Sequence, residues 1–360
     1  RAETSFDDSV DTYAPEVYHK AKELLEKDIA DGVYIKDTDS AYYVYELVMD
    51  GRSQTGIVAC ASVDDYVNGV IKKHENTRED KEIDRITHVD TCNAQTGPIF
   101  LAYRSEKVID EIVAKKQKEE PIYDFTAVDG ITHRVWKIAE AEDVEKLEKA
   151  FADIENIYIA DGHHRAASAV KVGLKRRKEN PGYTGDEEFN YFLSVLFPDD
   201  QLMIMDYNRV VKDLNGYSFQ SFYKEMKKRF DVTEITDQKE KRPQEKGSFT
   251  MYMEGHWFLC KFREDDLAAV ADDPVKSLDV SMLQDLLLHP VLGIGDPKTD
   301  GRIDFVGGIR GMDELVRRCE EDCSVAFAMY PTSITELFSV ADAGKLMPPK
   351  STWFEPKLRS

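Results

Sequence analysis

The chain has little positive charge for its length, and this shortage excludes two classes of partner. Lys and Arg number 48 against 69 Asp and Glu, so the formal net charge is -21 over 360 residues. A field of that sign repels phosphate backbones and anionic lipid surfaces. We therefore expect no broad binding to nucleic acid and no attachment to an anionic membrane, although a local basic pocket would still bind a small anion.

Cysteine is scarce, and long apolar runs are missing. There are 5 cysteines, an odd number, and none are arranged as Cys-x-x-Cys. Because cytoplasmic chains rarely carry structural disulfides, we interpret all of them as reduced residues of a cytoplasmic protein. No stretch approaches the roughly 20 apolar residues that a membrane-spanning helix needs.

Two glycine-rich nucleotide motifs are also missing. Lys350, Ser351 and Thr352 could bind phosphate, but no glycine-rich loop precedes them, so they do not form a Walker A motif. The segment "VGGIRGM" (306–312) lacks the glycine spacing of a dinucleotide fingerprint. It predicts only a turn that leads into a helix.

Hairpins and helices are mixed along the first half of the chain. Apolar residues at helical spacing predict helices at 14–32 and 141–154. Asp-Gly pairs between β-rich runs predict hairpins at 40–63 and 122–139. Because strands and helices do not alternate steadily, the pattern favours an α+β fold over a doubly wound parallel sheet.

A turn-rich segment, "ENPGYTGDEE" (179–188), predicts a boundary between two lobes near residue 185. We therefore expect a first domain at 1–185 and a second α+β lobe at 186–360. Beyond the boundary, the apolar runs 189–198 and 202–211 are expected to be paired buried strands. The run 247–263 is expected to be a hairpin that turns at Glu254 and Gly255.

The most informative stretch is "IENIYIADGHHRAASAVKVGLKRRK" (154–178). An apolar strand ends at Asp161, and a run of small residues predicts a helix directly after it. A helix N-terminus offers unpaired N–H groups and partial positive charge, and Gly162 allows close approach of a ligand. His163, His164 and Arg165 add donors, so the corner predicts an anion site that suits phosphate best.

Asp161 does not suit simple anion binding. A carboxylate beside a phosphate usually holds Mg²⁺ or orients a hydroxyl group. The alternative interpretation is that Asp161 caps the helix and that the two histidines lie on the surface.

A second candidate segment is "KKHENTREDKEIDR" (72–85). A charge run of this kind is often only a solvated face. The functional alternative makes Glu75 a general base and Arg78 or Lys81 phosphate ligands. We expect His74 and Glu75 at the end of a short helix.

Small polar residues gather in "THVDTCNAQTGPIF" (87–100), just before a predicted strand. They are Asn93, Gln95, Thr96 and Gly97, which either bind a small molecule or close a loop. Both interpretations stay open.

Three motifs together resemble a known family. "KHENT" (73–77), "ADGHHRAAS" (160–168) and "MPPKSTWFEPKL" (347–358) are similar to the bacterial family called domain of unknown function 1015. That family is distantly similar to the nucleotide-binding domain of ParB partition proteins and to sulfiredoxin. It also resembles the free-serine kinases, which phosphorylate L-serine to O-phosphoserine.

The resemblance covers residues 40–358 approximately. It implies a ParB/sulfiredoxin-like mixed sheet with helices in the first lobe and nucleotide phosphates at the Asp161–Arg165 corner. Glu75 lies where the serine kinases keep an acidic residue, and Lys350, Ser351 and Thr352 match the family's own terminal motif. This chain is longer than the simplest serine kinases, so the second lobe could change the substrate.

Motifs and resemblance together give each candidate residue a role. The catalytic candidates are Glu75, Asp161 and His164, and the nucleotide-binding candidates are Gly162, His163, His164, Arg165 and Arg78. The substrate-binding candidates are His74, Lys350, Ser351 and Thr352, and Asp161 is the candidate ligand of Mg²⁺.

Three functions compete. The first is a small-molecule kinase that uses ATP or ADP and Mg²⁺, with free L-serine or a similar hydroxyl metabolite as acceptor. The second is a ParB-like nucleotide-dependent regulator linked to DNA partition or transcription, which the acidic charge and the lack of a basic helix-turn-helix disfavour. The third is a metal-dependent hydrolase with His74, Asp161, His163 and His164 as ligands, although adjacent helical histidines point about 100° apart. A homodimer is left open.

Overall fold

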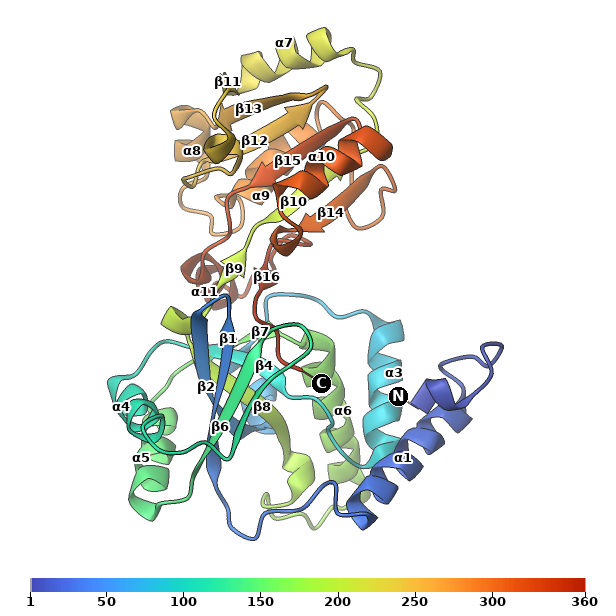
Figure 1. Ribbon diagram of the computed structural model, residues 1–360, viewed down its shortest axis with the longest axis vertical. Coiled ribbons are helices and arrows are strands. Elements are labelled where there is room, and N and C mark those ends of the chain that lie inside the picture. Colours follow the sequence, from blue (N-terminus) through green and yellow to red (C-terminus); the bar gives the residue numbers. More distant parts are fainter. Residues whose placement is uncertain (1, 360) are drawn as a thin grey trace. The chain divides into compact units, whose positions relative to one another are not determined.

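The chain folds into two compact units, each with its own sheet. The structure is a computed structural model that describes residues 2–359, apart from the side chain of Gln238. Unit 1 comprises residues up to Leu202 and a tail that begins at Pro356, whereas unit 2 comprises Met203–Glu355 (Figure 1). Unit 2 is thus an insertion into unit 1.

The boundary expected at residue 185 lies too early. Strand β8 (Tyr191–Pro198) pairs with β2 (Arg52–Ser62) and with β4 (Ile99–Tyr103), so it belongs to the first sheet. The apolar runs 189–198 and 202–211 are therefore not partners, because β10 (Tyr207–Val211) pairs with strands of unit 2. The residues of both runs are buried or half-buried, and an apolar pattern alone does not determine the partner strand.

Unit 1 is built on a mixed sheet with the order β3-β7-β4-β8-β2-β1-β6-β5. The expected hairpins are confirmed as β1–β2 and β5–β6, and the pairs β3–β7 and β4–β8 are parallel. The remaining strands are β1 (Tyr42–Met49), β3 (Ile71–Lys72), β5 (Tyr123–Thr126), β6 (Thr132–Ile138) and β7 (Ile157–Asp161).

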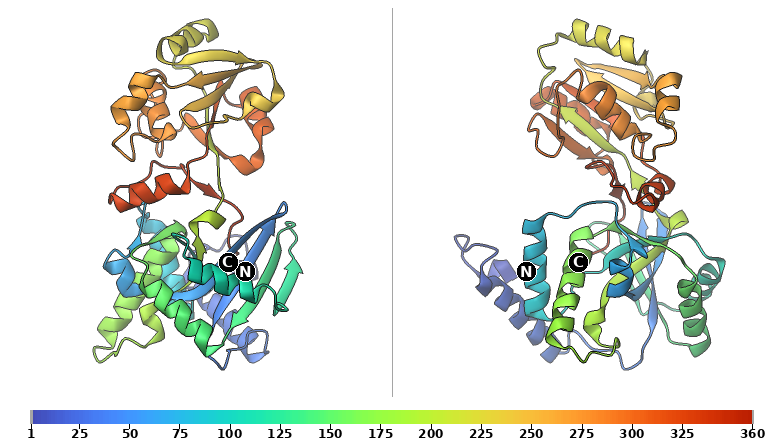
Figure 2. Two further views of the ribbon diagram at one scale, coloured as in Figure 1. Left: turned by 90° about the vertical axis from the view of Figure 1, so that its left-hand side faces the viewer. Right: turned by 180° about the vertical axis from the view of Figure 1, so that it is seen from behind.

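Helices flank this sheet on both sides. The pair α4 (Lys107–Lys116) and α5 (Ala141–Ala152) lies on one side, and α6 (His163–Glu179), α3 (Glu79–Cys92) and α1 (Pro15–Ala30) lie on the other (Figures 1 and 2). The helices expected at 14–32, at 141–154 and after Asp161 are confirmed. The core between the layers consists mainly of aliphatic side chains, among them Val44, Ile57, Leu101, Leu147 and Ile159.

One expected helix ends earlier than the sequence suggested, and one helix was missed. Helix α2 (Val63–Val67) ends well before His74, so His74 and Glu75 lie in a loop that follows β3. From Glu79 onward the charged segment forms α3. This helix packs beside α6 and α1.

Unit 2 contains an antiparallel sheet with the order β11-β13-β12-β15-β10-β14. The hairpin expected at 247–263 is confirmed, with Glu254 and Gly255 in left-handed conformations at its turn. The strands are β11 (Asp231–Ile235), β12 (Ser248–Met253), β13 (His256–Lys261), β14 (Ile303–Gly307) and β15 (Val325–Met329), and β9 (Ile204–Met205) pairs with β16 (Trp353–Phe354). The helices are α7 (Phe219–Arg229), α8 (Glu264–Val270), α9 (Asp279–Leu283), α10 (Met312–Glu321) and α11 (Ile334–Asp342).

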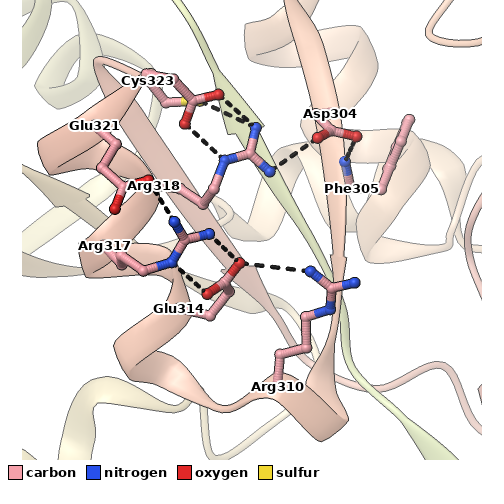
Figure 3. A network of polar contacts seen from close by, with 9 residues as sticks. Asp304, Phe305, Arg310, Glu314, Arg317, Arg318, Glu321 and Cys323 are labelled. Atoms are coloured by element: carbon pink, nitrogen blue, oxygen red, sulfur yellow. Dashed lines mark hydrogen bonds and ion pairs between the residues drawn. The ribbon is translucent and has the colours of Figure 1, made fainter.

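A network of polar contacts lies along α10 and reaches β14 of unit 2 (Figure 3). The guanidinium of Arg318 donates hydrogen bonds to Asp304 of β14 at 2.8 Å and to Asp322 at 2.7 Å. The guanidinium of Arg317 donates to Glu314 at 2.8 Å. Because most of its members are exposed, each pair contributes little to stability. We interpret this network as structural.

The fold class is α+β, as the sequence predicted, with a mixed sheet in the first unit and a second α+β unit. Across residues 2–359, no helix combines the length and the apolar character that crossing a bilayer requires.

Close packing of α6 in unit 1 gives a first prediction. A Cβ at Gly173 would lie 2.4 Å from the carbonyl oxygen of Phe189 and 3.1 Å from Val63 Cγ2. Alanine favours a helix by about 1 kcal/mol over glycine, but a backbone oxygen cannot rotate away. Gly173→Ala should therefore lower the free energy of unfolding by about 1–3 kcal/mol in urea titrations.

Gly182→Ala is the matched control, because no described atom outside Gly182 and its two chain neighbours lies within 4 Å of the position of its Cβ. It should leave the unfolding midpoint nearly unchanged. Equal midpoints for both variants would show that α6 does not pack as described.

Candidate functional site

A cavity of about 870 Å³ lies in unit 1 at the start of α6. Its walls come from the N-terminal segment, from α3 and the loop after it, from the Asp161–Arg165 corner and from the C-terminal tail. Glu75 also lines it. Segments that are far apart in the sequence thus meet around one space.

The corner has the backbone geometry that the sequence suggested. Gly162 has φ 95° and ψ 29°, a left-handed conformation that glycine adopts without strain. The first helical hydrogen bond runs from the N–H of Ala166 to the carbonyl of Gly162 at 2.9 Å. No described side chain caps α6, so the interpretation of Asp161 as a cap is wrong. The first-turn N–H groups therefore stay available to a ligand.

Asp161 is held by two cations. Its Oδ2 lies 3.3 Å from Arg165 Nη2, and its Oδ1 lies 3.9 Å from Lys357 Nζ. Asp161 and Arg165 both line the cavity. Positive charge therefore gathers at the N-terminus of α6, where the helix dipole already favours anions.

The two histidines of the corner bind the neighbouring loop. His163 Nε2 accepts the N–H of His74 at 3.5 Å, and His164 Nε2 accepts the N–H of Arg78 at 3.1 Å. A ring nitrogen that accepts an N–H carries no proton, so both rings are neutral with the proton on Nδ1. Burial lowers the pKa of His163 well below its usual range and lowers that of His164 as well.

These hydrogen bonds fasten loop 74–78 to the corner. His163 and His164 line the cavity, but their Nε2 atoms are used for this contact. The geometry therefore gives them a positioning role, which the sequence did not suggest.

His74 is a buried packing partner. Its side chain is 1% exposed, and its ring meets that of His163 edge to face, with centroids 4.4 Å apart. Neither ring nitrogen has a hydrogen-bond partner among the described residues, and burial lowers the pKa of His74 to about 3. His74, expected as a substrate ligand, is not part of the cavity wall.

Glu75 and Arg78 differ in their placement. Glu75 lines the cavity, and its Oε2 lies 3.9 Å from His163 Nδ1. The guanidinium of Arg78 is mostly exposed and pairs with Asp80 at 2.8 Å. The structure thus brings Glu75 to the corner, whereas Arg78 contributes only its backbone N–H there.

Several wall residues were missed by the sequence reasoning. Helix α3 contributes Asp84, Arg85 and His88, and Tyr18 of α1 donates to Asp84 at 2.9 Å. Spacings of three and four residues on a helix were the signal that could have identified this face.

The polar residues before β4 have two roles. Gln95 donates to the carbonyl of Tyr191 at 3.1 Å and accepts the N–H of Leu193 at 2.6 Å, so its amide closes the loop against β8. Gln95, Thr96 and Gly97 all line the cavity. Asn93 has φ 49° and ends α3.

Lys350, Ser351 and Thr352 belong to unit 2 and are not part of the cavity wall. The carbonyl of Lys350 accepts from Arg209 at 3.2 Å, and the carbonyl of Ser351 accepts from Thr332 at 3.1 Å. Ser351 itself is buried. These contacts give the trio a structural role within unit 2.

The described residues contain no group of three or more His, Cys, Asp or Glu side chains that could hold a metal ion by themselves. The hydrolase hypothesis therefore gains no support from the geometry. Mg²⁺ is commonly bound by one or two carboxylates together with substrate phosphates. Asp161, at the corner, fits that pattern.

Comparison with known proteins identifies the family. A family model described as "Protein of unknown function (DUF1015)" matches residues 1–281. The chain belongs to this family. The family that the sequence motifs suggested is thereby confirmed. No curated protein matches the DUF1015 chain.

Solved structures resemble the DUF1015 chain only distantly. A free serine kinase in complex with AMP has 15% identity and a TM-score of 0.36, covering 82% of this chain and 86% of that one. SbnI from Staphylococcus aureus, truncated at its C-terminus, has 12% identity and a TM-score of 0.42, with coverages of 83% and 82%. A conserved hypothetical protein from Pyrococcus furiosus has 14% identity and a TM-score of 0.35, with coverages of 82% and 90%. Scores this low do not carry a functional assignment.

The buried histidine pair predicts a pH effect on stability. His74 titrates near its ordinary pKa of 6.5 when unfolded but at about 3 when folded. Below pH 6.5 the unfolded chain binds a proton that the folded chain excludes, so stability falls as the pH falls. One such group costs about 1.4 kcal/mol per pH unit in this window. His74→Phe should make the loss of stability between pH 6 and 4 shallower by about that amount.

Urea titrations at several pH values measure this slope. His289→Phe is the control, since it makes the same replacement of histidine by phenylalanine at an exposed position. If His74→Phe and His289→Phe gave the same slope as the parent chain, His74 would not be buried in its neutral form.

Proposed function

We propose that the cavity of unit 1 transfers a phosphoryl group from ATP or ADP to the hydroxyl group of a small metabolite, with free L-serine as the first candidate. One observation carries the proposal: Glu75 and the Asp161–Arg165 corner line the same cavity. The choice of serine rests on the sequence resemblance to free-serine kinases. The proposed partners are the nucleotide and the metabolite, and a net charge of -21 opposes the DNA-linked alternative.

The corner supplies the phosphate-binding half of the reaction. No described side chain caps its helix N-terminus, Gly162 carries no side chain to block approach, and Arg165 offers a forked donor. Backbone N–H groups, the helix dipole and a guanidinium together favour a phosphate chain. When Mg²⁺ is bound, it neutralises phosphate charge, and Asp161 is the residue that would hold it.

Glu75 acts on the acceptor hydroxyl group in the proposed reaction. Glu75 lines the cavity, and its Oε2 lies 3.9 Å from His163 Nδ1 at the corner, whereas Asp161 is assigned to Mg²⁺. Glu75 is therefore the candidate that removes the hydroxyl proton. The freed oxygen forms a bond to the terminal phosphorus as the bond from phosphorus to the leaving phosphate oxygen breaks, and the proton stays on Glu75 until solvent takes it.

Phosphorus NMR tests the activity directly. The protein is incubated with Mg²⁺ and with ATP or ADP, in the presence of a panel of amino acids and sugars. A new phosphomonoester signal with L-serine or another hydroxyl metabolite is expected. Hydrolysis of the nucleotide without any phosphorylated acceptor would contradict the proposal.

Glu75→Gln tests the base. The variant keeps the shape of the side chain but cannot accept the proton, so turnover should fall by about 10²–10⁴-fold. Nucleotide affinity, measured by calorimetry, should change little because the phosphates are bound at the corner. Glu79→Gln, at an exposed position of α3 outside the cavity wall, should behave like the parent chain. Near-normal turnover of Glu75→Gln would remove Glu75 from the mechanism.

A further inference from the structure

The loop that carries Glu75 contacts helix α3 as well as the corner. Thr77 is half-buried in this loop, and its hydroxyl donates a hydrogen bond to the carboxylate of Glu82, near the start of α3. The two histidines of the corner bind the same loop through the N–H groups of His74 and Arg78. The contact of Thr77 is therefore a third attachment, and it lies between the other two along the chain.

Helix α6 holds Glu82 in place. Lys171 Nζ pairs with the carboxylate of Glu82, whose side chain is 9% exposed. The hydroxyl of Ser168 donates to the backbone carbonyl of Glu82 at 3.3 Å. His164, Ser168 and Lys171 follow one another at spacings of four and three residues, so they lie on one face of α6. This one face therefore binds both the loop and the glutamate that the loop contacts.

Glu82 stays ionised in this position. Burial acts to raise its pKa, but the hydrogen bonds from Lys171 and Thr77 outweigh burial and hold the pKa below its ordinary value. An ionised carboxylate is a stronger hydrogen-bond acceptor than a neutral group. Glu82 is not part of the cavity wall. Any effect of Glu82 on a ligand in the cavity must therefore pass through the residues that it contacts.

We propose that Glu82, acting through Thr77, fixes loop 74–78 against α6 and thereby positions Glu75 at the corner. The inference rests on the proposed function, because it takes Glu75 as the base. A base must lie within hydrogen-bond reach of the proton that it removes. A displacement of about 1 Å can lower a rate by about 10²-fold, so an attachment two residues away from Glu75 affects turnover.

A purely structural contact is the alternative. It would stabilise the start of α3, where the N-cap residue Arg78 makes no capping hydrogen bond with its side chain. Its loss would then change the free energy of unfolding and leave the turnover of the folded protein unchanged. The loss of a positioning contact changes turnover through Glu75.

Steady-state kinetics of Thr77→Val test the inference on the full-length protein. Valine keeps the shape of threonine but has no hydroxyl group to donate to Glu82. Turnover should fall by about 10- to 100-fold. KM for the nucleotide should change little, because the phosphates are proposed to bind at the corner. Thr77→Ser, which keeps the hydroxyl group, should recover most of the turnover.

A double variant tests whether Thr77 acts through Glu75. Once Glu75→Gln has removed the base, the position of this side chain no longer affects proton removal. The addition of Thr77→Val to Glu75→Gln should therefore cause no further loss of turnover. If the two losses multiplied, Thr77 would act by another route and the inference would be wrong.

Thr87→Val is the matched control. Thr87 lies on α3 outside the cavity wall, and its hydroxyl donates to the carbonyl of Ile83 in the same helix at 2.8 Å. Its turnover should equal that of the parent chain. Thermal unfolding verifies that each variant folds, and if Thr77→Val does not fold, the comparison rests on Thr77→Ala.

Amide hydrogen exchange gives a readout that needs no substrate. The N–H of Arg78 donates to His164 Nε2 at 3.1 Å, so its exchange rate reports how often the loop leaves the corner. Exchange at Arg78 should be about 10-fold faster in Thr77→Val, a factor that corresponds to the loss of one hydrogen bond. It should be unchanged in Thr87→Val.

The outcomes separate this inference from the proposed function. If the parent chain phosphorylates an acceptor and Thr77→Val is equally active, Glu82 does not position Glu75, and the kinase proposal stands. If the parent chain phosphorylates no acceptor, the kinase proposal is wrong and exchange at Arg78 decides alone. Faster exchange in Thr77→Val would then support Glu82 as the residue that fixes the loop, and unchanged exchange would contradict it.

Discussion

The left-handed turn at Gly162 is the constraint on which the candidate site depends. It ends β7 and starts α6 without an intervening loop, so Asp161 and the first helical turn occupy one small region. A side chain at this position would be strained, and its Cβ would lie 3.0 Å from Arg165 Nε. Because no described side chain caps the helix, its first N–H groups remain available to a ligand in the cavity.

Neutral histidines connect this turn to the rest of the site. Burial keeps His74 and His163 uncharged, and an uncharged ring can accept a backbone N–H where an imidazolium cannot. His163 and His164 thereby fasten the loop that carries Glu75 to the turn. The carboxylate proposed as the base is thus positioned by the same two residues that begin α6, the helix proposed to bind phosphate.

Local features of the site could be predicted from the sequence, whereas its long-range contacts could not. The corner was recognisable because Asp161, Gly162 and Arg165 are adjacent, and the hairpins were recognisable from their Asp-Gly turns. Helix α3 was missed because its charges resemble those of a solvated loop, although Arg85 and His88 reach the cavity. The return of Lys357 depends on the insertion of unit 2, which no local pattern reveals.

The central claim is that the corner and the histidine-bound loop form one phosphate site. A crystal structure of the full chain with ADP and Mg²⁺ tests it most directly. The account predicts phosphate oxygens within hydrogen-bond distance of the N–H groups of His163–Arg165, with Glu75 facing the same space. A nucleotide bound elsewhere, or phosphates that do not touch the first turn of α6, would contradict it.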